Sequence, residues 1–180
     1  MATTFHLADI PSNADLRSND APMPSPSIQL RAFQPGNAAD AMAFRTLNEW
    51  WIKKYFDIEK SDSEMLNDPE GYVLAKGGHI YFATADGVPV GCCALVPISP
   101  GIYEVAKMAV SEKWQGGGIG RKVLAYTVEQ GRALGARALY LETNNKLSNA
   151  IHLYESLGFR HLPPKPSPYV RANVFMELRF

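Results

Sequence analysis

The chain has 180 residues, of which 46% are hydrophobic, and its 18 lysines and arginines balance its 18 aspartates and glutamates. This length and composition are typical of one globular domain with a substantial core, and the zero net charge gives no indication of nucleic-acid binding. No run of apolar residues is long enough to span a bilayer, so we expect no membrane partner. Residues 1–20 lack the layout of a signal peptide and contain three aspartates, which predicts a cytoplasmic protein.

The first 27 residues differ in composition from the rest of the chain. Proline and serine dominate residues 21–27, and the segment before them shows no hydrophobic periodicity. Such a segment cannot bury enough apolar surface to offset the entropy of ordering it. We therefore expect residues 1–27 to be a disordered extension and residues 28–180 to form one domain.

From residue 28 onward, hydrophobic patterns predict strands and helices in alternation. We expect strands at 28–33, 80–85, 88–96, 103–110, from 138, and at 174–180. We expect helices at 38–55, 123–134 and from 147, a short helix within 57–69, and one ending at 77–78. The pair Asp86-Gly87 indicates a hairpin turn. Strands interleaved with helices predict an α/β or α+β fold with a mixed sheet.

A glycine-rich turn, Gln115–Gly120, joins the strand at 103–110 to the helix that follows it. Backbone N–H groups at the start of a helix lack intrahelical partners, and glycines let an anion approach them closely. Arg121 and Lys122 lie in the first turn, where the helix dipole disfavours cations unless an anion binds between them. The turn therefore predicts a pyrophosphate-binding site.

Two other phosphate-binding motifs do not fit these residues. A Walker A loop would need glycine at position 115 and lysine at 121, where the chain has Gln115 and Arg121. A dinucleotide fingerprint that starts at Gly116 would need glycine at 121. A glycine-rich surface loop without a ligand remains the alternative.

Two segments resemble motifs of the GNAT superfamily of acetyl-CoA-dependent N-acetyltransferases. Gln115–Gly120 reads Q-x-x-G-x-G, which is similar to the acyl-CoA loop of that family, and residues 150–159 are similar to its A-I-x-L-Y-E-x-x-G-F segment. The resemblance covers the chain from about residue 28 to its end. It implies a mixed, mostly antiparallel central sheet flanked by helices, with strands that splay apart at the CoA site.

The resemblance also implies which residues bind acetyl-CoA. The backbone of the strand at 103–110 is expected to pair with the pantetheine arm through Met108, Ala109 and Val110. The pyrophosphate is expected to lie on the residues of the turn, Gln115, Gly116, Gly117, Gly118, Ile119, Gly120 and Arg121. Many family members carry asparagine at the position of Leu147. Here Asn145 and Asn149 lie on either side of that position. Asn149 is the candidate for the family's role, and Asn145 is instead a candidate helix N-cap.

Acyl transfer to an amine needs a base and an acid. Strict alternation places Glu104, Met108 and Val110 on one face of their strand and Lys107 on the other. Glu104 matches the position of the family's base. The alternative is that Glu104 has no catalytic role and is simply salt-bridged or solvated. Tyr154 matches the tyrosine that protonates the departing thiolate. Its alternative is a packing role, because it lies on an apolar helical face.

The proline-rich segment 163–169 is expected to form a rigid loop over the acceptor cleft. Arg171 and Asn173 follow it, and Arg171 is a candidate to bind a substrate carboxylate, with loop capping as its alternative. Glu49 and Tyr55, late on the helix at 38–55, are further candidates for acceptor contacts.

These residues and the resemblance predict transfer of an acetyl group to the amine of a small molecule or amino acid, by direct attack in a ternary complex. Acetylation of protein amines and a non-catalytic acyl-CoA sensor are the alternatives, and a homodimer is left open.

Adjacent Cys92 and Cys93 point to opposite faces of a strand, which excludes a disulfide framework. We expect both cysteines to be small core residues. The alternative is that one of them acts as a nucleophile beside a cleft. The four histidines are scattered, so no metal is expected.

Overall fold

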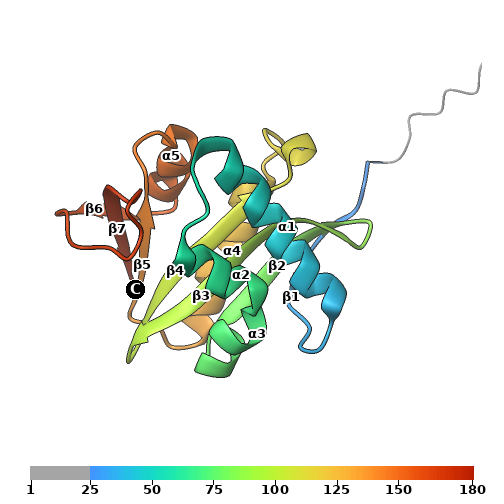
Figure 1. Ribbon diagram of the computed structural model, residues 1–180, viewed down its shortest axis with the longest axis horizontal. Coiled ribbons are helices and arrows are strands. Elements are labelled where there is room, and N and C mark those ends of the chain that lie inside the picture. Colours follow the sequence, from blue (N-terminus) through green and yellow to red (C-terminus); the bar gives the residue numbers. More distant parts are fainter. Residues whose placement is uncertain (1–24) are drawn as a thin grey trace, which may run out of the picture.

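The computed structural model describes residues 25–180 (Figure 1). The predicted disordered extension lies outside the described residues except for its last three positions. The described chain forms one sheet of seven strands in the order β1-β2-β3-β4-β5-β7-β6. Within residues 25–180, no helix has the length and apolar composition needed to cross a membrane.

The elements largely follow the predicted alternation. The strands are β1 (Ile28–Ala32), β2 (His79–Ala85), β3 (Val88–Ser99), β4 (Ile102–Val110), β5 (Ala138–Thr143), β6 (Arg160–Leu162) and β7 (Val174–Arg179). The helices are α1 (Ala38–Tyr55), α2 (Lys60–Asn67), α3 (Pro69–Tyr72), α4 (Ile119–Ala133) and α5 (Ser148–Ser156). Single 3₁₀ turns occupy Leu74–Lys76 and Glu112–Trp114. Strand β6 was not among the strands predicted from hydrophobic patterns, because three residues are too few to show a pattern.

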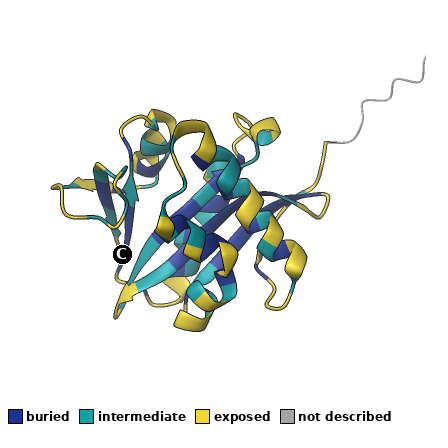
Figure 2. Cartoon of the chain, viewed as in Figure 1, coloured by how far each residue is buried: buried dark blue, intermediate teal, exposed yellow. Residues whose placement is uncertain are grey.

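Neighbouring strands are antiparallel except for β4 and β5, which are parallel. Helices α1, α2 and α3 cover one face of the sheet and α4 covers the other (Figure 1). Buried positions concentrate on the strands and on the inner sides of the helices (Figure 2). This architecture confirms the mixed, mostly antiparallel sheet that the family resemblance implies.

Each face of the sheet has its own hydrophobic core. The core under α1 and α2 includes Phe44, Ile52, Leu66 and Phe82. The core under α4 and α5 includes Leu124, Leu139, Leu141 and Tyr154. Cys92 belongs to the first core and Cys93 to the second, and both are free and fully buried. The prediction that they point to opposite faces is confirmed.

Strand β4 contains a β-bulge. Its register against β3 shifts between Ala106 and Ala109, because two residues of β4 lie opposite Cys93. Lys107 occupies the bulge with a φ of 50°, in the left-handed region that residues with a Cβ atom rarely adopt. A bulge bends its strand and redirects the side chains beyond it.

The bulge corrects an expectation from the sequence. Alternation predicted that Met108 and Val110 share a face with Glu104 and that Lys107 lies on the opposite face. In the structure Met108 and Val110 pack against the core under α4, whereas Lys107 contacts Asp62 of α2 on the other side of the sheet. The prediction is wrong beyond the bulge, since one extra residue reverses which face each following side chain takes.

Strands β4 and β5 separate soon after they meet. They pair only from Ile102 opposite Ala138 to Glu104 opposite Tyr140. Beyond Glu104 the backbone of β4 has no partner on this edge within the described chain. The expected splaying of these two strands is therefore confirmed.

Asp62 connects three separate parts of the fold. Its carboxylate has no exposed surface and lies 2.9 Å from the ammonium of Lys107 in β4. It also accepts two hydrogen bonds of 2.7 Å from Arg171, which precedes β7. Burial by itself raises the pKa of Asp62, but Arg171 and Lys107 outweigh burial and hold that pKa below its usual value. Asp62 is therefore ionised and fixes α2, β4 and the segment before β7 to one another.

We expect Asp62→Asn to lower the free energy of unfolding by about 3–5 kcal/mol, because it leaves the buried Lys107 ammonium without its counter-ion. Glu64→Gln is the matched control in the same helix, since Glu64 makes only an exposed i,i+4 pair with Lys60. That change should cost no more than about 0.5 kcal/mol. Chemical denaturation of both variants tests this prediction, and similar losses in the two would contradict it.

Candidate active site

The gap between β4 and β5 opens into a cavity of about 210 Å³. A second hollow of about 330 Å³ lies between the glycine-rich turn and α5. Tyr55, Val110, Gln115, Leu147 and Ala150 line both. The two hollows therefore form one cleft, which runs from the glycine-rich turn to the end beside Glu104. We call this second end the acceptor end, because the sequence predicts the acceptor there.

The glycine-rich turn presents unpaired backbone donors to this cleft. The N–H groups of residues 116–121 donate to no group within the described part of the chain. Gly118 is the N-cap of α4 with a φ of 79°, which glycine adopts without strain. A Cβ atom at Gly116 or Gly118 would meet no other atom within 4 Å, so open space lies above the turn. The turn thus has the donors, the helix dipole and the room that a phosphate group needs.

The side chains around the turn hold it in place. The Gln115 amide donates to the Val110 carbonyl at 3.0 Å, which ties the turn to the end of β4. Ile119 is buried and anchors the first turn of α4. Arg121 is exposed and donates to the Ser156 hydroxyl of α5 at 2.7 Å. Helix α4 begins at Ile119 rather than at the predicted residue 123, because Ile119 is the single apolar side chain of a first turn that otherwise contains glycine and two cations.

The backbone candidates lie along the cleft. Met108, Ala109 and Val110 line the cavity on the part of β4 that β5 has left. Asn149 is exposed near the start of α5 and lines the second hollow. Asn145 is not the N-cap of α5: the N-cap is Leu147, and the Asn145 amide group pairs with Asn173.

Tyr154 faces the middle of the cleft. Its ring is buried and packs edge-on against Phe159, with centroids 6.0 Å apart. Its hydroxyl has no hydrogen-bond partner within the described residues, and the residue lines the cavity. Burial raises the pKa of Tyr154 above its ordinary value, and the nearby Cys93 adds to the shift. The phenol is therefore protonated at neutral pH. The ring of Tyr154 can pack in the core while its hydroxyl is still available to donate a proton.

Glu104 lines the cavity where β4 and β5 stop pairing. Burial raises the pKa of Glu104 to about 7, and the negative charge of Glu142 on β5 adds to the shift. Lys107 and Lys165 oppose it. At neutral pH this carboxyl group is therefore partly ionised, which suits a group that accepts a proton and then releases it.

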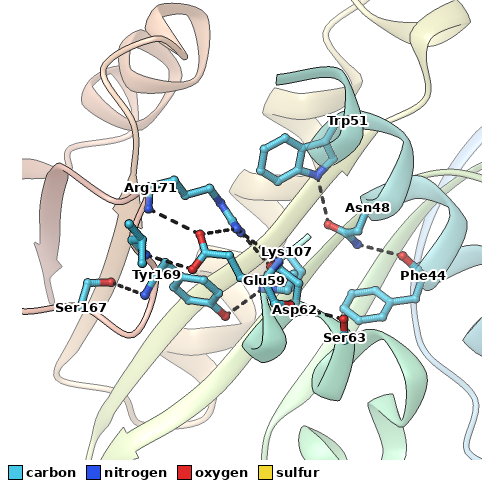
Figure 3. A network of polar contacts seen from close by, with 11 residues as sticks. Phe44, Asn48, Trp51, Glu59, Asp62, Ser63, Lys107, Ser167, Tyr169 and Arg171 are labelled. Atoms are coloured by element: carbon cyan, nitrogen blue, oxygen red, sulfur yellow. Dashed lines mark hydrogen bonds and ion pairs between the residues drawn. The ribbon is translucent and has the colours of Figure 1, made fainter. Parts of the chain in front are cut away.

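A polar network closes the acceptor end (Figure 3). The Lys107 ammonium donates to the Tyr169 hydroxyl at 2.9 Å, and Tyr169 belongs to the proline-rich segment. Arg171 lies 2.9 Å from Glu59 and 2.7 Å from Asp62. Tyr169 and Arg171 both line the cavity, so residues 163–171, the proline-rich segment with the two residues after it, form the covering segment. The guanidinium of Arg171, the candidate ligand for a substrate carboxylate, is already held by two carboxylates of the protein.

The other acceptor candidates lie in different places. Tyr55 lines both hollows and is 49% exposed. Glu49 is paired with Arg45 at 2.6 Å and Lys53 at 2.8 Å and does not line either hollow. Asn173 accepts from the backbone N–H of Asn145 at 2.9 Å and thereby joins β7 to the loop before α5.

Several residues of the cleft were not identified from the sequence. Glu142 accepts hydrogen bonds from the hydroxyls of Tyr140 and Ser167 and lines the cavity. Trp51 lines the same cavity, and its indole N–H donates to the buried Asn48 at 3.2 Å. One signal was available: Lys107 is a charged residue within an otherwise apolar strand segment, which indicates a buried ion pair.

Comparison with known proteins gives a consistent result. The model of the acetyltransferase (GNAT) family matches residues 44–159. An uncharacterized N-acetyltransferase of Escherichia coli, YjgM, is 35% identical over 94 residues, which cover 50% of this chain and 56% of that protein. The IAA acetyltransferase of Azospirillum brasilense is 39% identical over 127 residues, which cover 67% of this chain and 80% of that protein. The chain thus spans little more than half of the Escherichia coli relative.

Solved structures share the fold. YncA of Salmonella typhimurium, described as a putative acetyltransferase and solved with its cofactor acetyl-CoA, superposes with a TM-score of 0.68 at 20% identity, covering 85% of this chain and 94% of that one. The family match spans β4, the glycine-rich turn, α4, β5 and α5, which together form the cleft. The chain therefore belongs to the GNAT family of acetyltransferases.

Proposed function

We propose that the chain is an acetyl-CoA-dependent N-acetyltransferase that acts on a small-molecule amine by direct attack in a ternary complex. The observation that carries this proposal is the single cleft with unpaired backbone donors at one end and Glu104 at the other. Tyr154 lies between them with a protonated phenol. The cofactor of the Salmonella structure supports acetyl-CoA as the donor.

The backbone of this chain would bind the donor. The N–H groups of residues 116–121 would hold the pyrophosphate, aided by the dipole of α4 and the charge of Arg121. The free edge of β4 at Met108, Ala109 and Val110 would pair with the pantetheine amides as an added strand does. Acetyl-CoA bound in this way supplies an acetyl thioester beside Tyr154.

The side chains would move the protons. Glu104 accepts the proton that the amine nitrogen loses as the new C–N bond to the acetyl carbon forms. Tyr154 donates its hydroxyl proton to the sulfur as the C–S bond breaks, and it is protonated again from solvent. The pKa of Glu104 near 7 and the raised pKa of Tyr154 put both groups in the required states at neutral pH.

The cysteines favour direct transfer over a covalent acetyl-enzyme. Neither Cys92 nor Cys93 lines the cleft, and both are fully buried. Burial raises the pKa of Cys93 to about 12 and that of Cys92 further still. A thiol with so little thiolate at neutral pH is a poor nucleophile.

The acceptor end favours a small molecule over a protein. Its cavity holds about 210 Å³, and Tyr169 and Arg171 of the covering segment are tied to Lys107, Glu59 and Asp62. A peptide would need an open groove in place of this cover. The unpaired hydroxyl of Tyr154 and the raised pKa of Glu104 favour turnover over a non-catalytic acyl-CoA sensor.

We expect Gly118→Asp to weaken acetyl-CoA binding by about 10²-fold or more, because it places a negative charge against the phosphates. Gly135→Asp is the matched control at the other end of α4. Gly135 has a φ of 76° and equally open surroundings, so it imposes the same backbone strain far from the cleft. Isothermal titration calorimetry measures both affinities. A folded Gly118→Asp variant with unchanged affinity would rule out the proposed phosphate site.

Tyr154→Phe should lower kcat by about 10²- to 10⁴-fold and leave the affinity for acetyl-CoA nearly unchanged, because only the acidic hydroxyl is lost. Tyr126→Phe is the control, since Tyr126 packs edge-on against Tyr81 and does not line the cleft. Steady-state kinetics with thiol detection tests this prediction. Full activity in Tyr154→Phe would leave Tyr154 as a packing residue.

The rate should depend on pH through Glu104. A base acts only when ionised, so kcat/KM of the wild type should rise as pH increases through about 7. Above that pH, ionisation of Glu104 is complete and contributes no further increase. Glu104→Gln should remove that rise, while the further rise toward the pKa of the acceptor amine remains in both. A pH profile of kcat/KM for wild type, Glu104→Gln and the surface variant Glu64→Gln measures this. An inflection near 7 that persists in Glu104→Gln would assign it to another group.

A further inference from the structure

Two carboxylates lie together at the acceptor end of the cleft. Glu104 is in register with Tyr140 on the neighbouring strand, and Glu142 follows Tyr140 by two residues on the same face of β5. Both carboxylates line the cavity. Glu142 is held in place by the Tyr140 hydroxyl, which donates to it at 2.8 Å, and by the hydroxyl of Ser167.

Both cations that line this cavity are already neutralised by the protein. Lys107 pairs with Asp62 at 2.9 Å, and Arg171 pairs with Glu59 at 2.9 Å and with Asp62 at 2.7 Å (Figure 3). The two positive charges of Lys107 and Arg171 are cancelled by the two negative charges of Asp62 and Glu59. Burial lowers the pKa of Lys107 while Asp62 opposes that shift, and any loss of its proton would make the region more negative. Glu104 and Glu142 therefore leave the cavity with an excess of negative charge.

Lys165 is the remaining cation near these carboxylates. It is exposed, and its ammonium lies 3.6 Å from the centroid of the Tyr140 ring. Lys165 does not line the cavity and makes no ion pair with the described residues. Its charge acts on Glu104 at a distance and does not offset the effects of burial and Glu142.

The rest of the cavity wall is largely apolar and aromatic. The rings that line it are Trp51, Tyr55, Phe56, Tyr154 and Tyr169. Lys107 and Arg171 already lie over the Tyr169 ring, and Arg171 also lies 5.8 Å from the centroid of the Phe56 ring. Lys54 lies 5.8 Å from the centroid of the Tyr55 ring, and Tyr154 lies beside the proposed thioester. Among the rings that line the cavity, Trp51 is therefore the one left for an apolar body on the acceptor side. Trp51 and Phe56 stand edge to face, with centroids 6.4 Å apart, at the end of α1.

Resting on the proposed function, we infer that the acceptor is a primary amine on an apolar or aromatic body that carries no carboxylate. Its ammonium group binds between Glu104 and Glu142, and its body lies against Trp51. Glu104 takes the proton that frees the amine for attack and releases it to solvent, so it is ionised again when the amine nitrogen loses its second proton, while Glu142 keeps its charge. An amino acid would bring its own carboxylate to two protein carboxylates, and among the described residues no unpaired cation lines the cavity to receive it. Arg171 holds the covering segment and does not bind substrate.

The test compares acceptors that differ in the carboxylate alone. Phenethylamine, phenylalaninamide and phenylalanine share one aromatic body, and tryptamine with tryptophan and isoamylamine with leucine repeat the comparison. We expect kcat/KM for at least one of the three amines to exceed that for its amino acid by about 10²-fold, since like charges brought together cost several kcal/mol. Phenylalaninamide should recover most of the difference if the negative charge is the cause.

Two variants assign the effect to the proposed site. Glu142→Gln removes the charge and keeps one of the two oxygens to which Tyr140 and Ser167 separately donate, and the hydroxyl at the other position can accept from the new amide NH2. It should raise KM for the preferred amine about tenfold with a much smaller change in kcat. Lys165→Ala removes the nearby cation that lies outside the cavity and should leave the preference for amines in place.

The outcomes separate this inference from the proposed function. If phenylalanine, tryptophan or leucine is acetylated as efficiently as its matched amine, the inference is overturned and the acetyltransferase activity stands. The inference is also overturned if protein that binds acetyl-CoA acetylates none of the three amines. A protein that neither binds acetyl-CoA nor releases its thiol with any acceptor contradicts the proposed function itself.

Discussion

The buried carboxylate of Asp62 determines the shape of the acceptor end. It receives donors from the start of its own helix, from the bulged strand β4 and from the segment before β7, so residues far apart in the chain meet at one point. Ionic hydrogen bonds that are shielded from water are strong, and their loss leaves buried charges without partners. Asp62 thus holds the covering segment against the sheet and neutralises the cations that would otherwise face the cavity.

Strand β4 departs from regular geometry at two points, and the cleft needs both. The bulge at Lys107 turns that side chain toward α2 and turns Met108 and Val110 toward the core under α4. The loss of pairing with β5 after Glu104 leaves backbone groups available to a ligand. An unbroken strand would have placed Met108 on the acceptor side and closed the edge on which an extended ligand can lie.

Much of this arrangement could be predicted from the sequence. The glycine-rich turn, the helix that carries Tyr154 and the position of Glu104 on its strand are local features, and local patterns identify them. The bulge could not be predicted, because Lys107 fits an alternating pattern as well as a broken one. The partners of Arg171 could not be predicted either, since Glu59 and Asp62 lie more than one hundred positions away in the chain. The charge balance of the cavity depends on those distant pairs, so the sequence left an amino acid and a simple amine equally open as acceptors.

The two ends of the cleft are built from different kinds of chemical groups. At the glycine-rich turn the donors belong to the main chain, which every substitution that preserves the fold retains. At the other end, recognition depends on side chains of α1, β4, β5 and the covering segment. Under the proposed function, the acceptor preference can therefore change by a few substitutions while the acetyl donor stays the same. Mutation of side chains thus constrains the two ends differently, because the first depends on backbone geometry and the second on side-chain identity.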